Sequence, residues 1–114
     1  MDKFEKFYNA ILSKLSERKI KVVVCTPAVI GEKTDGTNGL DADLNKYSDI
    51  IRKIAQQRFL PIVDLRKIFM DYEKLNNREN KESGVLTNDR VHLNDTANQL
   101  VADEMWKVLN TINK

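Results

Sequence analysis

Apolar positions three and four residues apart predict four helices along the chain. The first covers about residues 2–18, the second ends near residue 58, the third follows residue 64, and the last runs from about 95 to 112. This spacing puts the apolar side chains of each helix on one face, where they can pack against a core. In chain order these side chains are Phe4, Phe7, Tyr8, Ile11, Leu12 and Leu15; Leu44, Tyr47, Ile51, Ile54 and Ala55; Leu65, Ile68, Phe69 and Tyr72; and Ala97, Leu100, Val101, Met105, Val108 and Ile112.

Two runs without helical spacing predict short strands. Residues 20–25 are rich in β-branched side chains, and their nearly continuous apolar character fits a strand covered on both faces, as in a parallel sheet. Residues 59–64 hold a second run, in which Pro61 favours the start of a strand or an edge position. Residues 28–40 and 76–82 are turn-rich or polar, and we expect both segments to be surface loops.

The predicted order is α-β-α-β-α-α, in a single domain that spans residues 1–114. Helices between consecutive strands imply that the strands are parallel and that the fold is α/β and layered. Two strands, however, give too little surface to bury the apolar faces of four helices, and they leave backbone groups unpaired at both sheet edges. We therefore expect a partial unit with few parallel strands, completed by another chain or by self-association.

Composition limits the classes of function. Hydrophobic residues make up 41% and charged residues 32% of the 114 residues, which is typical of a globular chain. The net charge of +2 is spread without a basic stripe, so we expect no nucleic-acid partner. No apolar stretch approaches the ~20 residues of a membrane span and no signal peptide is present, so we expect a chain that is soluble as given. The native compartment stays open, with the cytoplasm as the default.

Cysteine and histidine are each present once, as Cys25 and His92. One cysteine cannot form an internal disulfide, and a zinc site needs more ligands than these two residues supply, so we expect no metal and no other cofactor. Cys25 lies in an apolar run, where burial raises the pKa of a thiol, and this favours a packing role over a catalytic one. Asp35, Asp41 and Asp43 lack the spacing of a calcium loop and are expected to serve turns and a helix cap.

The most specific local feature is Asp89 followed three residues later by His92, just before the last predicted helix, whose N-cap we expect at Asn94 or Asp95. At this spacing a turn brings the carboxylate onto one ring nitrogen, which fixes the tautomer and leaves the other nitrogen free to take a proton from a hydroxyl. The alternative is a polar residue beside a helix and an aspartate that forms a turn. The catalytic interpretation is favoured because loops at the carboxyl ends of parallel strands commonly build sites.

Three segments resemble those of a known family. The block Asp-x-Val-His-Leu-Asn at residues 89–94 is similar to the last signature block of SGNH (GDSL-type) hydrolases. Residues 22–27, Val-Val-Val-Cys-Thr-Pro, resemble the strand that leads into a Thr-Pro turn in their sheet, and residues 62–65, Ile-Val-Asp-Leu, resemble the strand before the last block. The similarity covers nearly the whole chain in the right order, and it implies a flavodoxin-like, three-layer fold.

The resemblance also implies a function, namely the C-terminal part of a serine ester hydrolase for an acyl ester, a lipid or an acetylated sugar. Asp89 would be the orienting acid and His92 the general base of a triad whose serine lies in an N-terminal Gly-Asp-Ser block. A glycine and an asparagine from two intermediate blocks would help to hold the oxyanion, and the reaction would pass through an acyl-enzyme.

The sequence departs from the family pattern at the nucleophile, because none of its four serines lies in Gly-Asp-Ser after a strand. We therefore expect the missing strands and blocks upstream of Met1. Gly-Thr-Asn-Gly at residues 36–39 looks like an oxyanion block, but it follows the Thr-Pro turn and is better explained as a turn, with a substrate contact by Asn38 as the second interpretation. The serines are Ser13, Ser16 and Ser48, in predicted helices, and Ser83.

Two other functions stay open at this stage. Unpaired sheet edges and apolar helix faces fit a non-catalytic remnant or interaction module that self-associates. A third interpretation is an unrelated flavodoxin-like half in which the Asp-His spacing is accidental. The partners to consider are therefore an ester substrate, an N-terminal half and a second copy of the chain. Whether the 114 residues are active alone is left open, because the serine nucleophile is missing.

Overall fold

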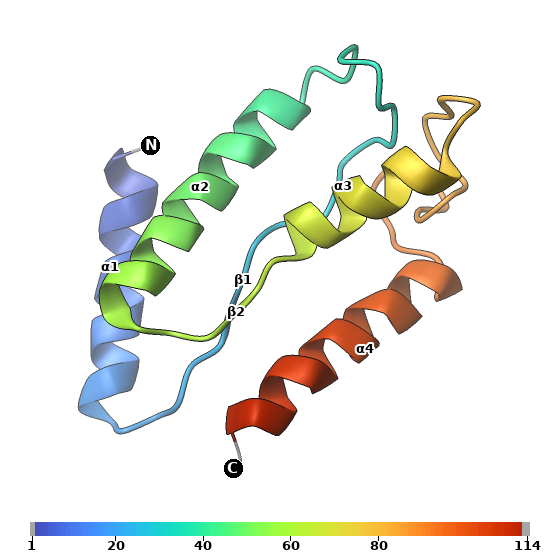
Figure 1. Cartoon of the computed structure of the whole chain (residues 1–114). Coiled ribbons are helices and arrows are strands. Elements are labelled where there is room, and N and C mark those ends of the chain that lie inside the picture. The colour runs from blue at the N-terminus through green and yellow to red at the C-terminus, as the bar shows by residue number, and fades with distance from the viewer. Residues whose placement is uncertain (1, 113–114) are drawn as a thin grey trace.

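The computed structural model describes residues 2–112 and contains four helices and two strands. Their order is α1 (Asp2–Glu17), β1 (Val24–Cys25), α2 (Asp41–Arg58), β2 (Ile62–Val63), α3 (Leu65–Asn76) and α4 (Asp95–Ile112). In the view of Figure 1, α1 and α2 lie to one side of the strands, and α3 and α4 lie to the other. The predicted α/β order and the partial character of the unit are confirmed.

The strands are parallel, as predicted, but much shorter than expected. Val24 pairs with Ile62 and Cys25 with Val63, and the sheet contains no further strand within residues 2–112. One backbone bond continues the ladder at each end, from Val24 to Pro61 at 3.1 Å and from Thr26 to Val63 at 3.2 Å. The pairing stops there because Pro61 has no N–H to donate and α3 begins at Leu65, directly after Asp64.

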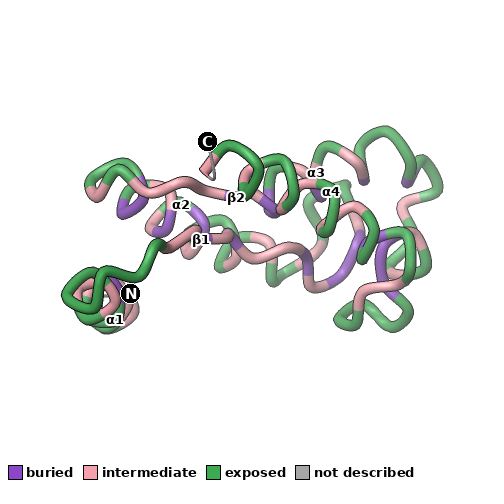
Figure 2. The backbone as a smooth tube through the Cα atoms, turned by 90° about the horizontal axis from the view of Figure 1, so that it is seen from below, coloured by how far each residue is buried: buried purple, intermediate pink, exposed green. Residues whose placement is uncertain are grey.

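Buried apolar side chains form two clusters, one on each side of the strands. Figure 2 shows the buried segments where strands, helices and loops meet, and a mostly exposed α1. The face of α4 predicted to point inward packs on the cluster that contains Phe69 and Leu86, and Ala97 is fully buried there. The first cluster contains Leu12, Val24, Ile51, Ile54 and Ala55, and the second contains Val29, Val63, Leu65, Phe69, Leu86 and Ala97.

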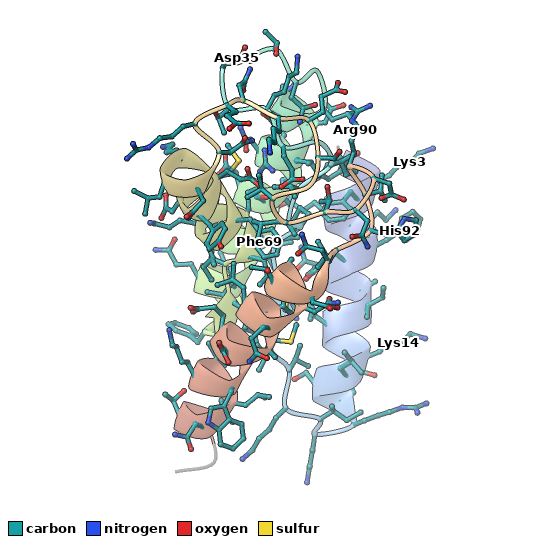
Figure 3. The ribbon with its side chains drawn as sticks, turned by 90° about the vertical axis from the view of Figure 1, so that its right-hand side faces the viewer. Lys3, Lys14, Asp35, Phe69, Arg90 and His92 are labelled. Atoms are coloured by element: carbon teal, nitrogen blue, oxygen red, sulfur yellow. The ribbon has the colours of Figure 1, made fainter. Side chains whose placement is uncertain are left out.

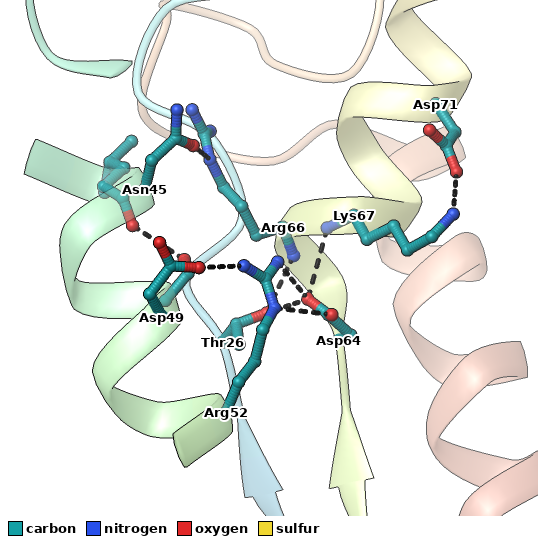
Figure 4. Close-up of polar contacts among 10 residues, drawn as sticks. Thr26, Asn45, Asp49, Arg52, Asp64, Arg66, Lys67 and Asp71 are labelled. Atoms are coloured by element: carbon teal, nitrogen blue, oxygen red, sulfur yellow. Dashed lines mark hydrogen bonds and ion pairs between the residues drawn. The ribbon is translucent and has the colours of Figure 1, made fainter. Parts of the chain in front are cut away.

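The junction between β2 and α3 is organised by Asp64 (Figure 4). Its carboxylate accepts hydrogen bonds from Thr26 Oγ1 at 2.8 Å and from Arg52 Nε at 2.8 Å, and it caps α3 by accepting from Lys67 N at 3.3 Å. Burial alone would raise the pKa of Asp64, but the hydrogen bonds from Arg52 and Thr26 outweigh it, so the pKa is lowered. An ionised carboxylate thus ties β1, α2 and α3 together at one point.

Replacing Asp64 with asparagine should lower the free energy of unfolding by about 1–2 kcal/mol at neutral pH, because the charge-assisted bonds to Arg52 and Thr26 weaken. The folded pKa lies below the unfolded value of about 3.9, so this stabilisation is present above that value and is lost as the pH falls through the folded pKa. Urea titrations of the wild type and Asp64→Asn should therefore differ at neutral pH and converge as the pH falls through the folded pKa of Asp64.

Asp71→Asn is the matched control, because Asp71 pairs with Lys67 at 2.7 Å on an exposed surface of α3. Such an exposed pair contributes little, so the change in the free energy of unfolding should stay within about 0.5 kcal/mol. Equal losses in Asp71→Asn and Asp64→Asn would show that Asp64 has no special role at the junction.

Part of the predicted apolar surface is not covered by residues 2–112. Phe7 and Ile11, both on the predicted apolar face of α1, are 61% and 60% exposed. The predicted helices are therefore correct, but on α1 only part of the apolar face, around Leu12, finds a partner. No helix of the described segment combines the length and the apolar character that a membrane crossing needs.

Candidate active site

Two loops meet at the carboxyl ends of the strands (Figure 1). The first follows β1 and covers residues 26–40, and the second joins α3 to α4 and covers residues 77–94. Gly31 N donates to Arg90 O at 2.8 Å, and Glu32 N donates to Glu82 O at 3.0 Å. The region where sequence reasoning expected a site is therefore built from two loops that hydrogen-bond to each other.

Asp89 and His92 are brought together in a tight turn of the second loop. Asp89 Oδ2 lies 2.7 Å from His92 Nδ1. The other carboxylate oxygen accepts the backbone N–H of His92 at 2.7 Å and that of Val91 at 3.1 Å. An aspartate that caps the N–H groups two and three residues ahead is a common turn, so the local sequence itself sets the geometry.

The carboxylate of Asp89 is held in its ionised form. The backbone N–H of His92 is the largest cause, followed by the imidazole and the N–H of Val91, and together they lower the pKa of Asp89 to about 2. An ionised acceptor at Nδ1 places a proton on that nitrogen and leaves Nε2 with its lone pair free. The His92 side chain is 77% exposed, and Figure 3 shows it at the surface, before α4.

Two serines of this chain are engaged elsewhere. Ser13 Oγ accepts from Arg58 at 3.0 Å, and Ser48, which is buried, donates to Leu44 O at 2.7 Å. None of the four serines makes a hydrogen bond with His92 within residues 2–112. The described part of the chain therefore shows an acid and a base, but no serine hydroxyl hydrogen-bonded to them.

Asn38 is used inside the first loop. Its amide nitrogen donates to Ile30 O at 2.7 Å and to Asp41 Oδ1 at 3.1 Å, and its oxygen accepts from Leu40 N at 3.3 Å. A Cβ at Gly31, which has φ +82°, would lie 2.9 Å from that amide nitrogen, so the loop closes tightly there. These contacts give Asn38 a structural role, and a substrate contact by it stays a prediction.

Sequence reasoning missed three buried charged residues that support the loops. Arg66, only 2% exposed, donates to Asn45, to Ala28 O and to Asp41, each at 2.9 Å, and so ties the first loop to α2 and α3. Figure 4 shows the bond from Arg66 to Asn45. The other two are Glu32 and Glu73, each 1% exposed. Glu73 lies four residues after Phe69 and therefore on the buried face of α3. This helical spacing was the signal from which the burial of Glu73 could have been predicted.

Metal binding and thiol chemistry find little support among the described residues. No three His, Cys, Asp or Glu side chains of residues 2–112 lie in position to hold a metal ion together. Cys25 is half-buried, and burial raises the pKa of its thiol, which keeps it in the protonated and unreactive form.

The fold, an α/β unit of parallel strands whose carboxyl-end loops carry the Asp89–His92 pair, matches a fragment of the SGNH esterase fold. Residues 1–100 match the model of the GDSL-like lipase/acylhydrolase family, and the chain belongs to this family. A crystal structure of an acetyl xylan esterase, AlAXEase, superposes with a TM-score of 0.90 at 57% identity over 93% of this chain. The chain spans 54% of that esterase's length. No curated protein gave a match.

Proposed function

We propose that this chain supplies the acid and base of a serine ester hydrolase, with Asp89 as the orienting acid and His92 as the general base. The observation that carries the proposal is the 2.7 Å contact between Asp89 Oδ2 and His92 Nδ1, which leaves Nε2 free and exposed. The serine comes from an N-terminal half with a Gly-Asp-Ser block, on the same longer protein or on another polypeptide.

The geometry of the pair suits both halves of an acyl-transfer reaction. His92 Nε2 takes the proton of the serine hydroxyl as its oxygen attacks the ester carbonyl, and Asp89 stabilises the imidazolium that forms. The imidazolium then gives this proton to the leaving alcohol, and an acyl-enzyme remains. Water repeats the sequence in the second half, releases the acid and restores the free serine. Donors for the oxyanion come from the N-terminal half together with the serine.

The open side of β1 is where the N-terminal half adds its strands. The edge of β1 opposite β2 has no strand partner in the described part of the chain. Two apolar grooves, of about 470 and 380 Å³, run beside this strand, and both are lined by Tyr8 and Cys25. Strand addition at this edge pairs free backbone groups and covers both grooves, which is the surface a further sheet layer needs.

Acetyl esters of a polysaccharide are the substrate class we propose. The structural neighbour at 57% identity is an acetyl xylan esterase. His92 is exposed on the surface of this chain, which leaves room beside its Nε2 for a polymeric substrate once the serine half is in place.

Complementation tests the proposed function. The chain is joined to the Gly-Asp-Ser half of a full-length SGNH esterase, and the hydrolysis of 4-nitrophenyl acetate and acetate release from acetylated xylan are measured. We expect activity in the joined protein and none in either half alone, with loss of activity when the added serine is replaced by alanine. A folded, joined protein without activity would refute the catalytic role, and a preference for long acyl esters would refute the acetyl assignment.

The exposed apolar surface of α1 and the open edge of β1 support a second candidate function, a non-catalytic module that self-associates. Phe7 and Ile11 on α1 and the unpaired edge of β1 favour it, because apolar patches of this kind mark interaction surfaces. Sedimentation at low micromolar concentration separates the two. A monomer that binds the serine half supports the hydrolase, and a stable dimer that excludes this half supports the module.

A further inference from the structure

Two buried acids lie beneath the loop that carries Asp89 and His92. Glu32 follows β1 in the first loop, and Glu73 belongs to the last turns of α3; each side chain is 1% exposed. Two acids enclosed side by side are costly unless hydrogen bonds and a shared proton compensate the loss of water. The pair therefore requires a physical explanation that the proposed chemistry of Asp89 and His92 does not give.

The carboxylate of Glu32 binds the backbone of the second loop. It accepts from Leu86 N at 2.5 Å, from Thr87 N at 3.2 Å and from Thr87 Oγ1 at 2.6 Å, and Val85 N lies 3.4 Å away. Burial alone would raise the pKa of Glu32, but the hydrogen bonds from Glu73, Thr87 and Leu86 outweigh it, so the pKa is lowered. The ionised carboxylate of Glu32 thus accepts hydrogen bonds from consecutive residues, 85–87, of the second loop.

Residues 85–87 support the turn that holds Asp89 and His92. Thr87 Oγ1, itself bound to Glu32, accepts Arg90 N at 3.0 Å. The turn closes through Asn88 N to His92 O at 2.9 Å. One residue further out on each side, Thr87 and Leu93 form an antiparallel bridge. A single hydroxyl therefore connects Glu32 to the middle of the turn.

Glu73 supports Glu32 in the neutral form. Neither oxygen of Glu73 accepts a hydrogen bond of good geometry from any described residue, and the polar side chains near it are the Glu32 carboxylate and the Asn77 amide, which donates instead to Glu32 O and Lys81 O. Two ionised carboxylates cannot hydrogen-bond, whereas a protonated Glu73 donates its O–H to the Glu32 carboxylate. Burial first, and then the bond and charge of Glu32, raise the pKa of Glu73 to about 9, while the Asn77 side chain lowers it.

The charged groups of the surrounding elements are few. Lys33 in the first loop and Glu82 and Arg90 in the second line a small cavity of about 150 Å³ next to Glu32. On α3, the carboxyl group of Glu73 is the acid that affects the pKa of Glu32, which it lowers through a hydrogen bond. No lysine or arginine in the described residues forms an ion pair with either buried acid. The hydrogen bonds from residues 85–87 are thus the compensation that the geometry shows for Glu32, and Glu73 needs a proton to remain buried without a donor.

We propose that Glu32 is a positioning residue for the Asp89–His92 pair, and that Glu73 serves it as a neutral hydrogen-bond donor. The pair as a whole carries one negative charge, which the donors of residues 85–87 neutralise in part. Removal of the shared proton puts two like charges in a buried site. The hydrogen bonds that hold residues 85–87 then weaken, and the turn that aligns His92 becomes disordered. The inference rests on the proposed function for its catalytic consequence, but not for its structural one.

The test uses the single histidine as a reporter in the 114-residue chain. Long-range ¹H–¹⁵N spectra give the tautomer of His92 and the hydrogen bond at Nδ1, and the indole signal of Trp106, the single tryptophan, reports on α4. We expect the Nδ1–H signature of the wild type at neutral pH and its loss with a midpoint near pH 9, because Glu73 ionises there. The Trp106 signal should not follow this transition.

Glu73→Gln is the decisive variant, because glutamine keeps the shape and donates to Glu32 at every pH. It should keep the His92 signature up to about pH 10.5, because the amide of glutamine does not lose its donor as the pH rises. Glu32→Gln, which brings a donor against the N–H groups of residues 86 and 87, should lose the signature at neutral pH. A transition shared by the wild type and Glu73→Gln, or none in the wild type, would overturn the proposal.

The joined hydrolase provides the catalytic readout. Glu32→Gln should lower kcat by about 10- to 100-fold with little change in KM, since a small displacement of a catalytic group costs rate more than binding. Glu73→Gln should retain the wild-type kcat at neutral pH and exceed it above pH 9. Unchanged kcat in Glu32→Gln with an altered His92 signal would refute the positioning role, whereas absent activity in the joined wild type refutes only the proposed function.

Discussion

His92→Ala should lower kcat/KM of the joined hydrolase for esters by about 10³- to 10⁴-fold, because the chain has no other histidine to take the serine proton. The imidazole is 77% exposed, and its side-chain contact is with Asp89, so the free energy of unfolding should change by less than about 0.5 kcal/mol. Initial rates with 4-nitrophenyl acetate and urea titrations measure the two effects separately.

Asp89→Asn should have a loss of similar size, about 10⁴-fold, since an amide can hold His92 in the wrong tautomer without changing the shape of the site. Asp95→Asn is the matched control, because Asp95 is an exposed aspartate three residues beyond His92 at the start of α4. This control should retain wild-type rates. An equal loss in Asp95→Asn and Asp89→Asn would mean that general loop charge, and not a triad, governs activity.

Phe69→Ala should give the largest loss of stability, about 3–5 kcal/mol, because the ring is 0% exposed and lies in the cluster that joins β2, α3, α4 and both loops. Figure 3 shows Phe69 among the side chains of the interior. Denaturant titration followed by circular dichroism measures this loss. It should come with disorder of the second loop, since buried Leu86 belongs to the same cluster.

Phe59→Ala makes the same chemical change at a ring that is 94% exposed. Phe59 ends α2 with φ +55°, and neither phenylalanine nor alanine is favoured there, so the free energy of unfolding should shift by less than about 0.5 kcal/mol. Similar losses in Phe59→Ala and Phe69→Ala would contradict the core we describe.

The helices could be predicted from the sequence because their periodicity is a local property. The predicted end of the second helix at residue 58, the N-cap of α4 at Asn94, which accepts from Ala97 N at 2.9 Å, and the inward face of α4 are all confirmed. Strand lengths could not be predicted, because a strand is defined by its partner. Residues 20–23 have the composition of a strand but no neighbour to pair with in residues 2–112.

The contact between Asp89 and His92 could be predicted because a three-residue spacing within one turn leaves little freedom. The support of the turn could not. Glu32 is separated from Leu86 by 54 positions, and nothing near either residue indicates the contact. A buried acid is also the exception among glutamates, so composition favours the surface for Glu32 and Glu73 until the fold places them in the interior.

The covalent labelling of the nucleophile tests the central claim, that this chain supplies an acid and a base to a serine it does not contain. The joined hydrolase is treated with a fluorophosphonate, and the labelled residue and the labelling rate are determined by mass spectrometry. Our account predicts a label on the Gly-Asp-Ser serine of the added half, formed about 10³-fold more slowly in His92→Ala. A label on Ser13, Ser16, Ser48 or Ser83, or a rate that His92→Ala leaves unchanged, would contradict it.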